Sequence, residues 1–167
     1  AGQLTQAQSL LQSSALSGDG VTLLRADIAL ATGDPQRAMA LLRRQKITYG
    51  VQERLLRAQM ADENWQVVLD QHLPQCQAVF SSLVWQDYYR QALAGYAAHL
   101  ATEHDHHDPK VIMKTWQRLP DCIQQDAKIT NQWISAARSL GQDQAAQWII
   151  ESYLNRYPWD DTLVSQY

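Results

Sequence analysis

The sequence is poor in the residues that hold small disulfide-rich proteins together or that bind nucleic acid. Its 167 residues include two cysteines, Cys76 and Cys122, without a Cys-x-x-Cys spacing, which excludes a disulfide scaffold. A formal net charge of −3 argues against nucleic-acid binding, which normally goes with a basic excess. No apolar run approaches the ~18 residues that a membrane span needs. The hydrophobic content of 46% is nevertheless enough for a packed core.

Recognisable catalytic motifs are also missing. Gly18 and Gly20 resemble the start of a dinucleotide-binding loop, but residue 23 is leucine and no strand pattern precedes them. Walker, His-Glu-x-x-His and Gly-x-Ser-x-Gly patterns are absent, and no nucleophile stands with a base in a recognised pattern. We therefore expect neither an enzyme nor a bound cofactor.

One long amphipathic run dominates what the sequence does contain. Apolar residues between positions 85 and 100 recur at intervals of three and four, which is one continuous face of an α-helix. We interpret them as core packing, since a ligand-binding aromatic cluster does not require so regular a stripe. The residues of this face are Trp85, Tyr88, Tyr89, Ala92, Leu93, Tyr96, Ala97 and Leu100.

Helix breakers divide the rest of the chain into further helical segments. Pro35, for example, stands at the favoured first position of one of them. No alternating strand pattern of useful length occurs, so we predict an all-α fold of about nine helices in a single segment, residues 1–167. The predicted helices cover residues 3–16, 20–32, 35–46, 51–61, 65–73, 82–103, a segment opened by Asp108-Pro109, 126–140 and a segment after Gly141, before a short tail from Trp159.

A short pattern occurs twice, in residues 30–42 and again in residues 139–150. In each copy a helix ends at glycine, and a second helix begins with a small residue that faces its partner. The offset of 108 residues divides into three steps of 36, close to the ~34-residue period of tetratricopeptide (TPR) hairpins. We predict a right-handed superhelical stack of degenerate TPR-like hairpins. The aligned pairs are Gly33 with Gly141, Ala38 with Ala146, Leu41 with Ile149 and Leu42 with Ile150.

The predicted repeats are unequal. Asp62-Glu63 stands where a corner glycine would be, and an acidic, histidine-rich stretch forms another corner at residues 103–108. Because one hairpin cannot bury both of its faces, neighbours must stack, which predicts a concave groove lined by the first helix of each pair. We expect the first and last helices to leave an apolar face uncovered, as in a piece of a longer array.

Histidines gather at one of these corners. If the preceding helix continued, His99, Glu103 and His106 would share one face, and imidazole and carboxylate are both zinc ligands. His107 lies beside them and completes the candidate metal site. Against this, Pro109 disfavours helix at the residue before it, and a corner rarely supplies the supporting hydrogen bonds of a closed site. The alternative is a solvated hydrophilic loop.

Each predicted inner helix carries arginine. If these side chains line the groove, their guanidinium groups would pair with carboxylates of a partner peptide. The alternative is that they belong to ordinary solvated helix faces, where arginine is common. The candidate residues are Arg25, Arg54, Arg57, Arg90 and Arg138.

Both cysteines follow a Leu-Pro-x step, at Leu73-Pro74 and at Leu119-Pro120. Cys-Pro and Cys-x-x-Cys-His patterns are absent, so neither thiolate nor covalent haem attachment is indicated. We predict that Cys76 and Cys122 are small buried residues at helix starts.

The C-terminal part of the chain combines several soft motifs in a fixed order. A tryptophan-containing helix and a leucine-proline corner precede a helix ending near glycine, and an alanine-led helix and a Trp-Asp closing motif follow. In this order and spacing, residues 50–167 resemble the HemY-type proteins of proteobacteria, and not the unrelated flavin-dependent oxidase of that name. The motifs read Trp116-Gln-Arg-Leu-Pro120, Ile134-Ser-Ala-Ala-Arg-Ser-Leu-Gly141, Ala145-Ala-Gln-Trp-Ile-Ile-Glu151 and Trp159-Asp-Asp-Thr-Leu-Val-Ser-Gln-Tyr167.

This resemblance implies TPR-like repeats held at the bacterial inner membrane by N-terminal spans, with a role in late haem synthesis or its regulation. On this basis we expect a soluble segment on the cytoplasmic side that binds protein partners, such as haem-pathway enzymes. We expect it to touch the membrane only through an anchor outside this chain. One alternative is direct binding of haem, another porphyrin or a metal, with His72 or His99 as a haem ligand. A catalytic accessory role is the other.

Overall fold

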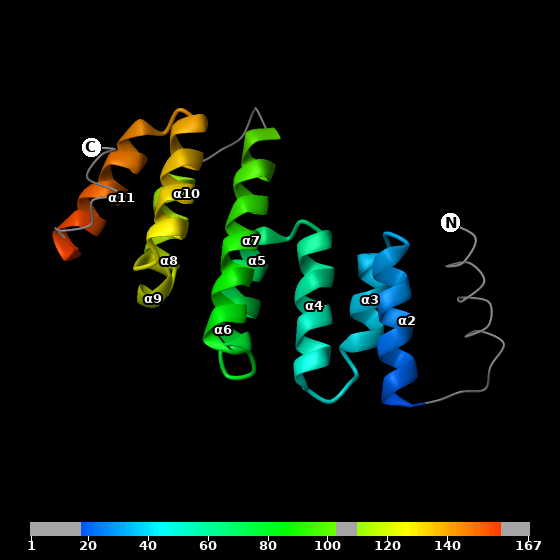
Figure 1. Cartoon of the computed structure of the whole chain (residues 1–167). Coiled ribbons are helices and arrows are strands. Elements are labelled where there is room, and N and C mark those ends of the chain that lie inside the picture. The colour runs from blue at the N-terminus through cyan, green and yellow to red at the C-terminus, as the bar shows by residue number, and fades with distance from the viewer. Residues whose placement is uncertain (1–17, 103–109, 158–167) are drawn as a thin grey trace. The chain divides into compact units, whose positions relative to one another are not determined.

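The computed structural model describes residues 18–102 and 110–157, and the regular structure there is entirely helical (Figure 1). No strand occurs within these two ranges, so the all-α prediction is confirmed. The chain divides into two compact units, Ala1–Ser82 (unit 1) and Leu83–Tyr167 (unit 2).

Unit 1 is built, in its described part, from three separate helices and one longer helical stretch. Their bounds agree with the predicted ones to within a few residues, except that the third predicted helix ends at residue 42 and not at residue 46. The helix expected at residues 3–16 lies outside the described residues. The elements are α2 (Asp19–Ala31), α3 (Pro35–Leu42), α4 (Tyr49–Ala61) and a continuous stretch of α5 (Trp65–Val67), the π-helical η1 (Val68–His72) and α6 (Leu73–Cys76).

Helix α3 ends early because its buried stripe ends. Ala38 and Leu42 are completely buried, whereas most side chains of residues 43–48 are exposed and include three cations. Another helical turn would bury little apolar surface, so it would not offset the entropy of ordering it. The chain instead turns into α4, where the hydroxyl of Thr48 accepts a hydrogen bond from the Val51 N–H at 3.4 Å.

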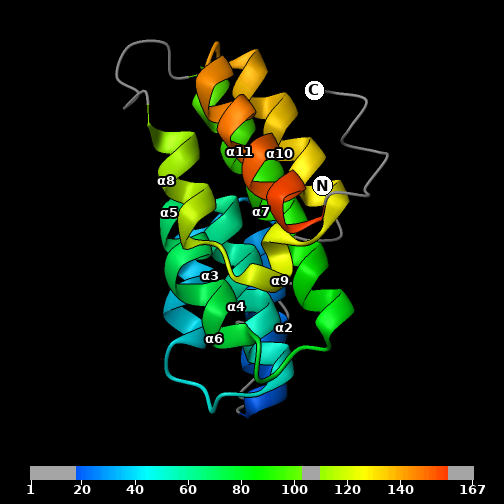
Figure 2. The ribbon, with the colours of Figure 1, turned by 90° about the vertical axis from the view of Figure 1, so that its left-hand side faces the viewer.

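Two layers of helices make up unit 1 (Figures 1 and 2). Helices α2 and α4 lie in one layer, and α3 with the α5–α6 stretch lies in the other. Alanines at the contacts allow the helix axes to approach closely, and longer side chains fill the remaining space. The core between α2, α3 and α4 consists of Ala26, Ala29, Ala38, Met39, Leu42, Val51 and Ala58.

Unit 2 is centred, in its described part, on the longest helix. The face predicted for residues 85–100 is the one that packs into the core, so this prediction is confirmed. Tyr96 of this helix stacks on Trp133 with ring centroids 6.3 Å apart. The elements are α7 (Ser82–Thr102), α8 (Val111–Arg118), α9 (Asp121–Gln124), α10 (Ala127–Ser139) and α11 (Asp143–Arg156). The tail expected from Trp159 lies outside the described residues.

Three helix corners share one geometry. The corner residues Gly33, Glu63 and Gly141 have φ angles of 75°, 56° and 69°, which is the left-handed region. In each corner the N–H of this residue bonds the carbonyl three residues earlier, at 3.1, 3.1 and 3.0 Å. The next N–H bonds the carbonyl five residues earlier, at 2.8, 3.3 and 2.8 Å. This pair of bonds is the Schellman motif, which satisfies carbonyls that would otherwise be unpaired at the helix end.

The corner at Glu63 explains how the irregular repeat still folds as a hairpin. The sequence has no glycine there, yet the backbone takes the conformation that glycine takes at the other two corners. A side chain at positive φ is strained, and the second Schellman bond of this corner is longer than its two counterparts. The corner geometry is therefore kept at a cost in backbone energy.

Candidate functional site

A hydrogen-bonded ion pair joins the two helices of the first layer of unit 1. Arg54 on α4 donates from Nε and Nη2 to the two carboxylate oxygens of Asp27 on α2, at 2.8 Å each. Its Nη1 also donates to the carbonyl oxygen of Gly50 at 3.0 Å. The hydrogen bond to Asp27 raises the pKa of Arg54, burial opposes this, and the charges of Asp27 and Glu53 add to it. The bidentate edge of this guanidinium is therefore already occupied.

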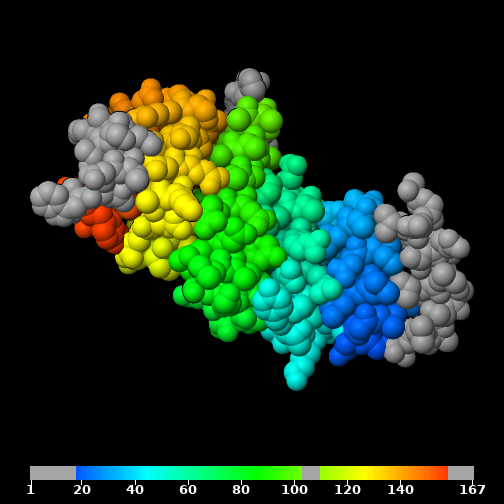
Figure 3. Space-filling model, viewed as in Figure 1, coloured from blue at the N-terminus to red at the C-terminus, as the bar shows by residue number. Residues whose placement is uncertain are grey.

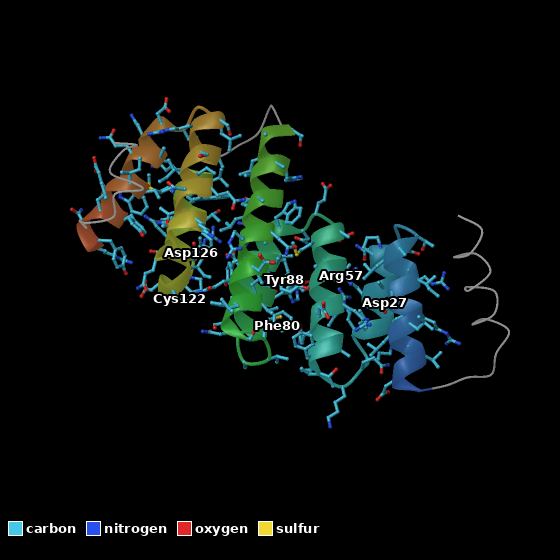
Figure 4. The ribbon with its side chains drawn as sticks, in the orientation of Figure 1. Asp27, Arg57, Phe80, Tyr88, Cys122 and Asp126 are labelled. Carbon is cyan, nitrogen blue, oxygen red and sulfur yellow. The ribbon has the colours of Figure 1, made fainter. Side chains whose placement is uncertain are left out.

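Arg57, one turn further along α4, is placed differently. Its side chain is exposed and makes no hydrogen bond or ion pair with any residue that the structure describes. Leu24 on α2 is also 48% exposed, which is high for a leucine. Figure 4 labels Asp27 and Arg57 on these neighbouring helices, and Figure 3 shows that α2 and α4 form one unbroken surface over unit 1. We call the exposed surface around Leu24, Asp27, Arg54 and Arg57 the α2–α4 face.

Arg90 in unit 2 is also paired with carboxylates. It contacts Asp87 on the same helix at 2.9 Å and Asp126, at the start of α10, at 3.9 Å. Asp126 also caps α10 by accepting hydrogen bonds from the N–H groups of Lys128 and Ile129 at 2.9 and 3.2 Å. These contacts give Arg90 a structural role between α7 and α10.

The five candidate arginines are therefore not equivalent. Arg54 and Arg90 are used inside their own units, Arg25 is partly buried on α2, and Arg138 is exposed on α10. The hypothesis that all five bind partner carboxylates stays a prediction. Arg57 fits it best, because its guanidinium group pairs with no residue in the described part of the chain.

The predicted metal site falls largely outside the described residues. His99 is partly buried on α7, whereas Glu103, His106 and His107 are not described. Among the described residues, no group of three or more His, Cys, Asp or Glu side chains is arranged to hold a metal ion. The metal hypothesis therefore stays a prediction.

His72, the other candidate haem ligand, ends the π-helical turn η1 and is partly buried. Burial lowers its pKa, and the positive charge of Arg43 lowers it further. A neutral imidazole is the form that binds a metal or haem iron. Burial and a nearby cation favour this form in any partly buried histidine, so haem binding at His72 also stays a prediction.

A shallow hollow in unit 2 has a cavity volume of only about 10 Å³. It is smaller than the roughly 300–1,000 Å³ of typical small-molecule pockets. Arg156 at its edge contacts Asp121 at 3.5 Å, and no histidine lines it. The lining residues are Trp116, Gln124, Ser152, Tyr153, Arg156 and Tyr157.

The two cysteines differ in their surroundings. Cys76 is buried, as predicted, but it ends α6, so the prediction that it stands at a helix start is wrong. Its Sγ lies 3.8 Å from Oε1 of Gln52. Burial raises the pKa of this thiol to about 11. Cys122 is exposed, so the prediction of a buried thiol is wrong there. The reason is its position on the short α9, where Ile123 is buried and the neighbouring Cys122 faces solvent.

Comparison with protein-family models, with curated proteins and with solved structures finds no match for the chain. In the described ranges, no helix has both the length and the apolar character to cross a membrane.

Sequence reasoning missed a group of residues at the connection between α3 and α4. Arg43, Arg44 and Lys46 are exposed there, and Ile47 and Tyr49 beside them are 69% and 45% exposed. Three cations within four residues are visible in the sequence, but they fell inside the helix predicted over residues 35–46. The early end of α3 is what brings them to a corner with the exposed apolar residues.

Proposed function

We propose that the chain is a non-catalytic protein-interaction scaffold built from TPR-like helical hairpins. The observation that carries this proposal is the corner geometry that recurs twice in unit 1 and once in unit 2. The helix after each corner also buries the same position. The residue five positions after the corner residue is at most 1% exposed at all three corners. These residues are Ala38, Val68 and Ala146.

The proposal extends to the way in which the hairpins are assembled. A hairpin of this type leaves apolar surface that a neighbour must cover, so such hairpins occur as arrays with a right-handed superhelical stack. Arrays of this kind bind partners along an extended surface. In this proposal, the surface is lined by the first helix of each pair.

The biological setting in this proposal is late haem synthesis at the bacterial inner membrane, where the chain would hold enzymes of the pathway together. Its support is the ordered set of motifs that residues 50–167 share with HemY-type proteins. Within that set, α10 ends just before Gly141, and the alanines that open α11 are buried. In this proposal, these motifs belong to the hairpin of α10 and α11, which are joined at the Gly141 corner.

The α2–α4 face is the part of unit 1 that we assign to partner binding. Arg57 supplies a guanidinium that pairs with none of the described residues and is open to a partner carboxylate, and Leu24 supplies exposed apolar surface on the neighbouring helix. The Asp27–Arg54 pair fixes the two helices against each other, which reduces the entropy that binding would cost. A partner segment with an acidic residue near an apolar anchor fits this arrangement.

Site-specific photocrosslinking tests the proposal. With a benzophenone amino acid at Leu24 in the membrane-anchored protein, we expect adducts with enzymes of tetrapyrrole synthesis in living cells. We expect Arg57→Glu to reduce these adducts about tenfold or more, since a charge reversal replaces attraction with repulsion at one contact. Mass spectrometry of the purified adducts identifies the partner.

Matched controls come from the opposite layer of unit 1. The same photocrosslinker at Ala40, which is exposed on α3, should not capture the partner, and Arg37→Glu should leave the Leu24 adducts unchanged. Equal capture from Leu24 and Ala40, or adducts that Arg57→Glu does not affect, would contradict the proposed surface. Adducts that contain no haem-pathway enzyme would contradict the proposed setting.

A further inference from the structure

The connection between α3 and α4 brings positive charge and exposed apolar surface to one corner of unit 1. Arg43, Arg44 and Lys46 are all exposed, and Ile47 and Tyr49 follow directly. We call these five residues the basic-apolar corner. Figure 3 shows this connection, in cyan, projecting at the lower edge of the surface of unit 1.

The cations of this corner are not neutralised within unit 1. None of the three forms an ion pair with a carboxylate of the described residues, although Arg43 acts electrostatically on His72. Asp19 begins α2 at the same end of the unit (Figure 1) and opposes only part of the charge. The corner is therefore positive on a chain whose net charge is −3.

The apolar part of the corner is exposed to an extent that folding does not explain. Ile47 is 69% exposed, so it contributes little to the core. Tyr49 is 45% exposed, and its ring packs edge-to-face on the buried Phe80 with centroids 5.0 Å apart. This contact holds the tyrosine in place at the surface, with one part of the ring on protein and the other in solvent.

We propose that the basic-apolar corner docks on an anionic lipid surface. The three cations would lie at the phosphate groups of the lipids, and Ile47 and Tyr49 would enter the interface between headgroups and acyl chains. Tyrosine favours this interface because its ring is apolar and its hydroxyl is polar.

A lipid surface fits the corner better than an acidic peptide or a nucleic acid. The corner projects from the unit, whereas a peptide is usually held in a groove. Nucleic-acid phosphates would pair with the cations but would leave Ile47 exposed, and the chain lacks the basic excess of nucleic-acid-binding domains. A bilayer takes up both the charges and the apolar side chains.

This contact does not depend on the α2–α4 face. The two proposals can therefore be tested independently. Vesicle binding examines the corner, and crosslinking from Leu24 examines the proposed partner surface.

Co-sedimentation of the 167-residue chain with lipid vesicles tests the inference. We expect binding to phosphatidylcholine vesicles that contain roughly 30 mol% phosphatidylglycerol, and little binding to pure phosphatidylcholine. Arg44→Gln combined with Lys46→Gln should lower the partition coefficient about 25-fold, at about fivefold for each cation. Ile47→Ser should lower it several-fold, because less apolar surface enters the interface.

Matched variants control for net charge and for exposed apolar surface elsewhere. Arg37→Gln combined with Lys128→Gln removes the same charge from two other exposed cations, and Leu24→Ser replaces another exposed apolar side chain. We expect these controls to retain most of the binding. Circular dichroism of each variant shows whether the helical fold is intact.

Three results would overturn the inference. The first is no binding to anionic vesicles by the wild-type chain, and the second is an equal loss of binding in the corner variants and the matched controls. The third is that the chain does not bind vesicles but binds an oligonucleotide or poly-glutamate. That binding would require Arg44 and Lys46 and would be unaffected by Ile47→Ser. That pattern would assign the corner to an acidic macromolecule.

Discussion

Glu63 occupies a backbone conformation that glycine holds at the two equivalent corners. Its φ angle of 56° keeps the two hydrogen bonds that close the hairpin between α4 and α5. The side chain of an L-residue in this region comes close to its own carbonyl group, which costs roughly 1 kcal/mol. The corner is thus held by the packing of the two helices against that local strain.

Replacing this residue measures the strain directly. We expect Glu63→Gly to be about 1 kcal/mol more stable than Glu63→Ala, because both variants remove the side-chain interactions and differ mainly at the backbone. Urea unfolding followed by circular dichroism gives the difference. Glycine being no more stable than alanine at this position would contradict the left-handed corner.

The two corner glycines provide the opposite control. A Cβ atom added at Gly33 or Gly141 would meet no other atom within 4 Å, so alanine there is disfavoured by its φ angle alone. Each of these substitutions should cost about 1 kcal/mol in the free energy of unfolding.

At the scale of the element, the α5–α6 stretch contains a π-helical turn that ends at His72. The wider turn interrupts the α-helical register within a single continuous helix. Its last residue is partly buried and lies within electrostatic reach of Arg43 on the connection after α3. The stability of this helix is therefore sensitive to the charge of one imidazole.

Stability should fall as the pH drops through the normal titration range of histidine. The pKa of His72 is lowered by burial and by Arg43, so the unfolded chain binds a proton at a pH where the folded chain does not. The contribution of His72 to the free energy of unfolding is fully present above the ordinary histidine pKa of about 6.5. It is lost as the pH falls toward and through the lower folded-state pKa. His72→Gln should flatten that part of the stability profile.

NMR titration of the His72 ring protons checks the same shift without unfolding the chain. Arg43→Gln should move the pKa back toward its ordinary value, since it removes the smaller of the two causes. A His72 pKa at or above the ordinary value in the folded chain would contradict this account.

For the molecule as a whole, the two compact units each contain one thiol in a different environment. Cys76 in unit 1 is buried, with its pKa raised to about 11, and Cys122 in unit 2 is exposed. Reaction with a thiol reagent requires both access and the thiolate. The reactivity of Cys122 is therefore a property of the folded chain, whereas reaction at Cys76 reports the opening of unit 1.

We expect one thiol of the native chain to react rapidly with a maleimide and the other to react only on unfolding. Mass spectrometry of the labelled peptides should place the rapid reaction at Cys122, and Cys122→Ser should abolish it. Unfolding in urea should then expose Cys76. Rapid labelling of both thiols in the native chain would show that unit 1 is open around Cys76.

Local patterns predicted most of the helical structure, and contacts distant in sequence account for what was missed. The stripe in residues 85–100 repeats along one helix, so its buried face followed from spacing alone. The Asp27–Arg54 pair joins residues on different helices, and no local pattern links them. Glu63 takes a conformation that its residue type disfavours, because the hairpin packing requires it. The exposure of Cys122 depends on which side of a four-residue helix faces the core.

The tight corners also determine where the chain tolerates a change in length. At the three left-handed corners, an inserted residue would break two hydrogen bonds and rotate the following helix away from its partner. Residues 43–48 join two hairpins without such a closed hydrogen-bonded corner. Loop-closure entropy grows only slowly with length, so this connection can be lengthened or exchanged at little cost. The surface chemistry of this corner of unit 1 can therefore change in evolution or by design while the hairpins on either side remain folded.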